Sequence, residues 1–181
     1  VGVKMHVVTA NESAVQNLVN CVARCHLTVS DFALAPYAAG LSALVEDEKD
    51  LGATVIDMGG GTTSFSVFYE GAAVYGDCIP VGGQHVTSDI ARGLSTTLQQ
   101  AERLKTLYGS CQPAPSDDRE LIDAPRIGEE DDTSPNRVPR SFLVSIIAPR
   151  LEETFELVRK RMEASGANGM AGQRVVLTGG A

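Results

Sequence analysis

An apolar strand runs directly into a glycine-rich turn at residues 53–63, with the sequence Ala-Thr-Val-Ile-Asp-Met-Gly-Gly-Gly-Thr-Thr. Glycine has no Cβ, so the backbone of residues 59–61 can bring its N–H groups close to an anion. The hydroxyl groups of Thr62 and Thr63 add further donors. We interpret this stretch as a phosphate-binding loop; the structural alternative is an ordinary glycine-rich hairpin.

Asp57 stands at the carboxyl end of this strand, and Met58 alone separates it from the glycines. A carboxylate at that place could order the water shell of a phosphate-bound Mg²⁺. The turn differs from a P-loop, because no lysine follows the glycines and residues 64–69 alternate as a strand. Glu70-Gly71 predicts a tight turn into a strand over 72–80, which completes a three-stranded meander.

Helices and strands are predicted on both sides of the meander. Before it, the pattern predicts a strand over 3–9, a helix capped by Asn11, a short strand over 32–35 and a helix over 37–45. After it come a helix behind Gly82-Gly83, a helix over 98–108 capped by Thr96 or Thr97, a helix over 141–165 interrupted or kinked at Pro149, and a strand over 173–178. This order indicates an α/β fold.

Residues 112–140 differ in composition, because they are rich in Pro, Asp and Glu and show little hydrophobic pattern. Such a stretch has little apolar surface to offset its ordering entropy. We expect a mobile loop, or a small polar subdomain with short strands near 120–124.

The 181 residues carry a net charge of −8, and 43% of them are hydrophobic. This composition suits one globular domain and argues against nucleic acid as a partner, since phosphate backbones need clustered Lys and Arg. No apolar run reaches the roughly 20 residues of a membrane span, and no signal peptide is evident. The ends, Val1 and a strand entering Gly179-Gly180-Ala181, lead us to expect a piece of a longer protein.

Cysteine and histidine offer no clear site. Cys21 and Cys25 lie one helical turn apart, but no second pair completes a metal site, so we expect buried free thiols in a reducing cytoplasm. His85 begins a helix without a visible partner and is expected to be exposed to solvent. No Ser-His-Asp or Cys-His arrangement can be argued.

Two further stretches are candidates for ligand binding. Residues 177–181 form a strand that enters a second Gly-Gly, which alone is typical of any strand-to-helix connection. Beside the first turn, it would flank a cleft at one edge of the sheet. Glu102 and Lys105 share a helix face, either as a surface ion pair or as contacts to the ribose and base of a nucleoside.

In their order, these motifs resemble those of the actin, Hsp70 and sugar-kinase superfamily. Residues 55–63 are similar to its second phosphate motif, Ala101-Glu102-x-x-Lys105 to its nucleoside-contacting helix, and 176–181 to its adenosine motif. Further segments are similar to the FtsA family of bacterial cell-division actin homologues. They are residues 5–27, 46–48, 80–83, Val86-Thr87-Ser88-Asp89-Ile90-Ala91 and Pro149-Arg150, so the resemblance covers nearly the whole chain.

The resemblance implies an actin-like (ribonuclease H-like) α/β ATPase fold, in which helices flank a mixed sheet beside a small polar α+β subdomain, with ATP and Mg²⁺ as ligands. It implies that Asp57 contacts Mg²⁺ through water and that Glu102 and Lys105 hold the ribose and base. The adenosine face would be held by Gly179 and Gly180, and the β- and γ-phosphates by Gly59, Gly60, Gly61, Thr62 and Thr63.

The family also implies a division of the chain and a set of partners. Residues 1–52 would end an FtsA-specific subdomain and add a helix of the first lobe, 53–111 would be the second-lobe nucleotide-binding core, 112–140 part of the small subdomain, and 141–181 the long helix and return strand. Such proteins form filaments and contact other divisome proteins. They anchor the FtsZ ring, through the FtsZ C-terminal tail, to the cytoplasmic side of the bacterial inner membrane at the division site.

Two departures from the family pattern matter. Bacterial cytoskeletal actins that hydrolyse ATP efficiently carry a Glu directly before the proline that corresponds to Pro36, and here that residue is Ala35, which cannot polarise water. We therefore expect slow hydrolysis. The first phosphate loop and the C-terminal membrane helix are missing, so this chain by itself should bind nucleotide weakly and should not bind membrane. The alternatives are a pilus-assembly homologue and a sugar-kinase-like phosphotransferase, although no catalytic carboxylate near a sugar pocket is evident.

Overall fold

The computed structural model describes residues 5–128 and 136–181. The chain divides into two compact units. The first unit contains Val1–Asp57, Ser64–Asp77 and Ser165–Thr178, and the second contains Met58–Thr63, Cys78–Ala164 and Gly179–Ala181. Each unit is described by itself below.

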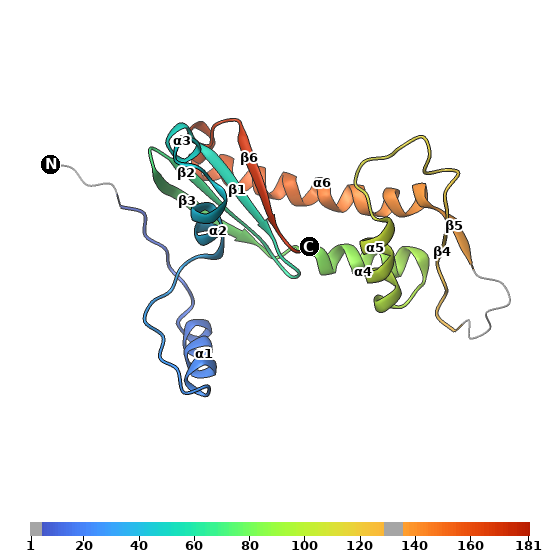
Figure 1. The fold of residues 1–181 in the computed structure, drawn as a ribbon, viewed down its shortest axis with the longest axis horizontal. Helices are drawn as coiled ribbons and strands as arrows, with labels where there is room; N and C mark the ends of the chain where they lie inside the picture. The colour runs from blue at the N-terminus through green and yellow to red at the C-terminus, as the bar shows by residue number, and fades with distance from the viewer. Residues whose placement is uncertain (1–4, 129–135) are drawn as a thin grey trace. The chain divides into compact units, whose positions relative to one another are not determined.

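A four-stranded sheet supplies most of the first unit. Its strands are β1 (Ala53–Met58), β2 (Thr63–Tyr69), β3 (Ala72–Ile79) and β6 (Arg174–Gly179), in the order β3-β2-β1-β6 (Figure 1). Positive φ angles at Glu70 (51°) and Gly71 (76°) make the tight turn between β2 and β3. The predicted three-stranded meander is confirmed, and the predicted final strand joins it beside β1.

Helix α2 (Ala35–Ala43) packs on this sheet through a glycine. A Cβ at Gly40 would collide with the ring of Phe68, so the helix approaches β2 closely only because Gly40 has none. The ring of Tyr37 stacks on that of Phe68 at 6.1 Å between centroids. Leu44, Ala53, Val55 and Phe68 form the buried core here.

The N-terminal segment differs from the prediction. Residues 5–9 and 32–34 form no strand, and Val7 is 69% exposed; residues 3 and 4 lie outside the described part. An isolated strand leaves its backbone groups unpaired, and no described strand pairs with these residues. Helix α1 (Glu12–Ala23) does begin at Asn11, whose Oδ1 accepts a bond of 3.2 Å from the Ala14 amide, as predicted.

The acidic stretch after α2 forms a helix of its own, α3 (Glu46–Leu51), which the sequence did not predict. Acidic side chains stabilise the first turn of a helix. Here the Glu48 carboxylate also accepts a bond of 3.0 Å from the Val45 amide.

The second unit is mainly helical, with α4 (Gly83–Leu94), α5 (Leu98–Tyr108) and α6 (Arg140–Ser165). The predicted cap of α5 is Thr97, whose hydroxyl accepts from the Gln100 amide. Helix α6 continues through Pro149, so of the predicted interruption or kink, the interruption is wrong. The core contains Val86, Ile90, Leu94, Ala101, Leu104, Ile122, Ala124, Leu143 and Ile147.

The predicted small strands are present in the polar segment. Strand β4 (Leu121–Asp123) pairs antiparallel with β5 (Arg137–Pro139). The prediction for residues 112–140 also covers residues 129–135, which lie outside the described part. Arg140 fixes the segment, because its Nε donates to the Tyr108 carbonyl (2.9 Å) and its Nη1 to the buried Asp117 carboxylate (3.0 Å). The described ends of this segment are therefore ordered by polar contacts.

The cysteines form no disulfide among the described residues, as expected, but all four are exposed. The predicted burial of Cys21 and Cys25 is wrong, because α1 buries none of its residues and Cys25, which follows α1, is exposed as well. Within the described ranges, no helix combines the length and apolar character needed to cross a bilayer.

Candidate functional site

The glycine turn connects β1 to β2 and forms a compact loop. The Gly59 amide donates to the Thr62 carbonyl at 2.8 Å, which closes the turn. Thr63 is fully buried and its hydroxyl donates to the Val81 carbonyl at 2.8 Å, so this predicted donor is already used within the protein. Gly60 and Gly61 are exposed, and their amides find no acceptor among the described residues.

This loop rests on the first turn of α4. The Gly83 and Gln84 amides donate to the carbonyls of Gly59 (3.0 Å) and Gly60 (2.8 Å). A Cβ at Gly82 would lie only 2.7 Å from the Gly60 carbonyl oxygen, so glycine is required for this close approach. The loop carbonyls therefore satisfy the N-terminal amides of α4, and the exposed donors are those of the loop itself.

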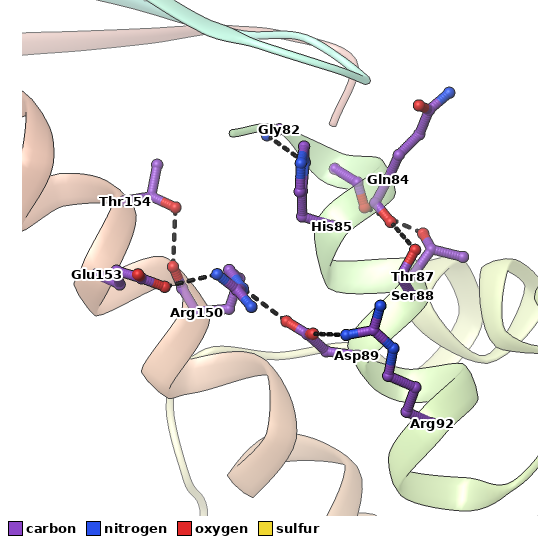
Figure 2. Close-up of polar contacts among 11 residues, drawn as sticks. Gly82, Gln84, His85, Thr87, Ser88, Asp89, Arg92, Arg150, Glu153 and Thr154 are labelled. Atoms are coloured by element: carbon purple, nitrogen blue, oxygen red, sulfur yellow. Dashed lines mark hydrogen bonds and ion pairs between the residues drawn. The ribbon is translucent and has the colours of Figure 1, made fainter. Parts of the chain in front are cut away.

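His85 has a structural role in the same turn. Its Nδ1 accepts a bond of 3.1 Å from the Gly82 amide (Figure 2), and the residue is half-buried. The prediction of a solvent-exposed histidine without a partner is wrong. Histidine is an unusual capping residue, which is why the sequence pattern did not indicate this contact.

The second glycine turn lies against the first. The Ala181 amide donates to the Met58 carbonyl at 3.0 Å, and Gly179 has a φ of 107°, which favours glycine. A Cβ on Gly83 would lie 3.0 Å from the Ala181 Cα. The two turns thus meet at one edge of the sheet, as predicted from their sequences.

Glu102 and Lys105 join α5 to α4. Lys105 Nζ lies 3.0 Å from Glu102 Oε2 and donates to the Gly83 carbonyl at 3.4 Å. The ion pair of the structural alternative is therefore present, with the Lys105 side chain 17% exposed and that of Glu102 53% exposed. Thr87 Oγ1 lies 2.6 Å from the same Glu102 oxygen, and this hydrogen bond, followed by that of Lys105, lowers the pKa of Glu102.

These groups line one cavity of about 590 Å³, which lies wholly within the second unit. Its lining residues are Gly60, Gly83, Gln84, Thr87, Ser88, Leu98, Gln99, Glu102, Lys105, Gly180 and Ala181. Of the predicted site residues, it brings together Gly60, Glu102, Lys105 and Gly180. Asp57, Gly59, Gly61, Thr62, Thr63 and Gly179 are not among the lining residues.

The sequence did not single out the part of the wall formed by Gln84, Thr87 and Ser88 as a site. Spacings of three and four residues place them on one face of α4. Leu98 and Gln99 come from the first turn of α5. Periodicity shows that such residues share a face, but not that two helices pack so that these faces meet.

An ion pair ties α4 to α6 beside this wall. Arg150 Nε lies 2.6 Å from Asp89 Oδ2, and Arg150 Nη1 lies 2.6 Å from Glu153 (Figure 2). The Asp89 hydrogen bond raises the pKa of Arg150. The two residues lie in separate segments that carry the family resemblance, and the structure brings these segments into contact.

Solved structures share this arrangement of strands and helices. MreB5 of Spiroplasma citri, solved bound to ADP, superposes with a TM-score of 0.74 at 20% identity, over 94% of this chain and 54% of that one. The PilM–PilN type IV pilus biogenesis complex gives a TM-score of 0.66 at 21% identity, over 94% of this chain and 42% of that one. The fold is therefore the actin-like α/β fold, in which helices flank a mixed sheet.

Sequence similarity narrows this class to one family. The family described as Cell division protein FtsA matches residues 54–179. Cell division protein FtsA of Rhizobium meliloti (strain 1021) is 52% identical over 180 residues, which are 99% of this chain and 41% of that relative. The chain belongs to the FtsA family, and it spans about 41% of the length of curated relatives that are 52% identical to it.

Proposed function

We propose that the cavity binds an adenine nucleotide, ATP or ADP, with the phosphates at the glycine turn. The observation that carries this proposal is the pair of exposed, unpaired amides at Gly60 and Gly61, which open beside a cavity lined by Glu102 and Lys105. Backbone amides of this kind bind anions, and a carboxylate accepts hydrogen bonds from sugar hydroxyls. The ADP in the MreB5 structure supports the same choice of ligand.

Mg²⁺ would accompany the phosphates. The described residues contain no group of three or more His, Cys, Asp or Glu that could hold a metal ion. This fits Mg²⁺, which keeps several waters and takes further ligands from phosphate oxygens. Asp57, half-buried in β1 and separated from the turn by Met58, is the residue we propose to contact that water shell.

The remaining ligand contacts follow the family pattern. We propose that Glu102 and Lys105 hold the ribose and base, and that Gly179 and Gly180 shape the adenosine face. Gly59, Thr62 and Thr63 would then support the phosphate loop, because their polar contacts close the turn and attach it to Val81.

Hydrolysis is proposed to be slow. Ala35 begins α2 directly before the buried Pro36, and a methyl group cannot orient or polarise an attacking water. ATP would then act mainly as a ligand that controls conformation and assembly. A sugar-kinase-like phosphotransferase would consume ATP rapidly once a sugar acceptor is present, so ATP turnover measured with and without sugar separates these two functions.

At the level of the whole protein, we propose a cell-division adaptor that forms filaments and anchors the FtsZ ring to the cytoplasmic face of the membrane. Family membership supports this role. In this proposal, residues 53–111 belong to the nucleotide-binding core and residues 112–140 to a small subdomain that contacts filament neighbours and other divisome proteins.

The test is equilibrium binding and turnover in the full-length protein. We expect saturable, Mg²⁺-dependent ATP binding that Asp57→Ala weakens while the fold is kept, and turnover well below the roughly 10 s⁻¹ typical of enzymes. Glu12→Ala, an exposed change on α1, is the control. Absence of ATP binding contradicts the nucleotide site, fast turnover contradicts the adaptor role, and failure to bind the FtsZ C-terminal tail peptide contradicts the proposed partner.

A further inference from the structure

Thr87 of α4 contacts a carboxylate on the neighbouring helix α5. It is 6% exposed in α4, and its Oγ1 lies 2.6 Å from Glu102 Oε2 and 3.0 Å from the Gly83 carbonyl in the preceding turn. A hydroxyl carries one proton, so the shorter contact to a charged acceptor is the bond that it donates. Thr154, a buried threonine of α6, instead donates to the Arg150 carbonyl in its own helix.

This bond and the Lys105 ion pair end on the same carboxylate oxygen. Thr87 and Lys105 both contact Glu102 Oε2, and within the described residues no hydrogen bond or ion pair reaches Oε1. The Glu102 side chain is 53% exposed and lines the cavity. One oxygen is therefore held by the protein, and the other is available to accept from a ligand.

The charge state agrees with that role. The Thr87 hydrogen bond and the Lys105 ammonium both lower the pKa of Glu102, so the carboxylate is ionised at neutral pH. An ionised carboxylate only accepts hydrogen bonds. The matching groups on a nucleotide are the ribose hydroxyls.

We propose that Thr87 is a positioning residue for sugar recognition: by holding Glu102 Oε2, it presents Oε1 to the ribose hydroxyls of the bound nucleotide. The inference rests on the nucleotide site proposed above. A carboxylate that is already held in one rotamer loses less side-chain entropy when it binds than a freely rotating one. The preference for a ribonucleotide over its dideoxy analogue therefore depends on Thr87.

The experiment compares the Kd values of ADP and 2′,3′-dideoxy-ADP in full-length protein. A hydrogen bond to a charged group predicts that the wild type prefers ADP by about tenfold or more. We expect Thr87→Val to reduce this preference at least about threefold, mainly by raising the Kd of ADP. Thr87→Ser should keep it, because the hydroxyl is retained. Thr154→Val, which removes a buried hydroxyl without a carboxylate partner, should leave the preference unchanged.

Each alternative result has a distinct meaning. If Thr87→Val raises the Kd values of ADP and 2′,3′-dideoxy-ADP by the same factor, Thr87 has only a structural role and the inference fails. A wild type that binds ADP but does not discriminate also overturns it, whereas a wild type that does not bind ADP overturns the proposed nucleotide site itself. In a Glu102→Ala background, Thr87→Val should change the preference no further, and an additional change contradicts action through Glu102. Thr87→Ala removes the same hydroxyl and serves as the second variant if valine prevents folding.

Discussion

Gly82→Ala tests whether the glycine loop rests directly on α4. A Cβ at residue 82 would lie 2.7 Å from both the Gly60 carbonyl oxygen and the Thr62 amide nitrogen, and closer still to the Gly59 carbonyl oxygen. All three are backbone atoms, which cannot rotate away as a side chain could. Because ordinary contact begins at 3.4 Å, the loop must retreat by at least about 0.7 Å, and by more at the Gly59 carbonyl.

That retreat disturbs the two bonds from the Gly83 and Gln84 amides to the loop carbonyls, which are 3.0 and 2.8 Å long. Each is worth about 0.5–1.5 kcal/mol, and overpacking adds roughly 1–3 kcal/mol, so we expect a loss of about 2–6 kcal/mol in the free energy of unfolding if both bonds are lost. With an m-value of about 2 kcal/mol/M, the urea midpoint should fall by roughly 1–3 M.

The assay is urea unfolding followed by circular dichroism, with Gly61→Ala as the matched control. A Cβ at residue 61 meets nothing within 4 Å, and we expect a change of no more than about 0.5 kcal/mol. ATP affinity should also fall in Gly82→Ala, whereas Gly61→Ala is a control for stability alone, because Gly61 belongs to the proposed phosphate loop. If Gly82→Ala is as stable as Gly61→Ala, the loop does not rest on α4 as described and the reasoning is refuted.

Three further outcomes follow from the same unit. Gly179→Ala should destabilise by about 2–4 kcal/mol in urea unfolding, because its φ is 107° and a Cβ would collide with Met58, whereas Gly180→Ala meets nothing within 4 Å and should be neutral. Arg150→Met should lower the free energy of unfolding by about 1–2 kcal/mol, since the pair that it breaks is only partly buried; equal stability would mean that the ion pair contributes nothing. Glu102 should titrate below an ordinary glutamate in a carbon-13 carboxyl NMR titration. Its pKa is lowered by folding, so its small contribution to stability is complete above the ordinary pKa and is lost as the pH falls through the folded value; a midpoint at or above the ordinary value contradicts this.

Much of the sheet could be predicted because its signals are local. Alternation in β2, the Glu70-Gly71 turn and the buried run of β1 each fix an element without distant contacts. The strand predicted over residues 3–9 failed because a strand exists only where a partner pairs with it, and the apolar pattern does not show a partner. The same limit applies to Cys21, whose helical position was clear while its exposure was not.

In the candidate site, the sequence indicated those residues whose type has a distinctive chemical property. The glycines marked both turns, and the charges of Glu102 and Lys105 marked a helix face. Thr87 carried no comparable signal, because its contact with Glu102 arises from the packing of α4 on α5. The use of the Thr63 hydroxyl by Val81 also depends on tertiary structure, so a donor expected for the ligand is taken by the protein.

The central claim is that a nucleotide occupies this cavity with its phosphates at the glycine turn. The most direct measurement is a two-dimensional NMR titration of full-length protein with ADP and Mg²⁺, with the backbone amides assigned. We predict saturable shifts at the amides of Gly60 and Gly61, together with those of Thr87 and Glu102 along the cavity wall. Saturable shifts confined to residues away from these positions, or no shifts at millimolar ADP, would contradict the account.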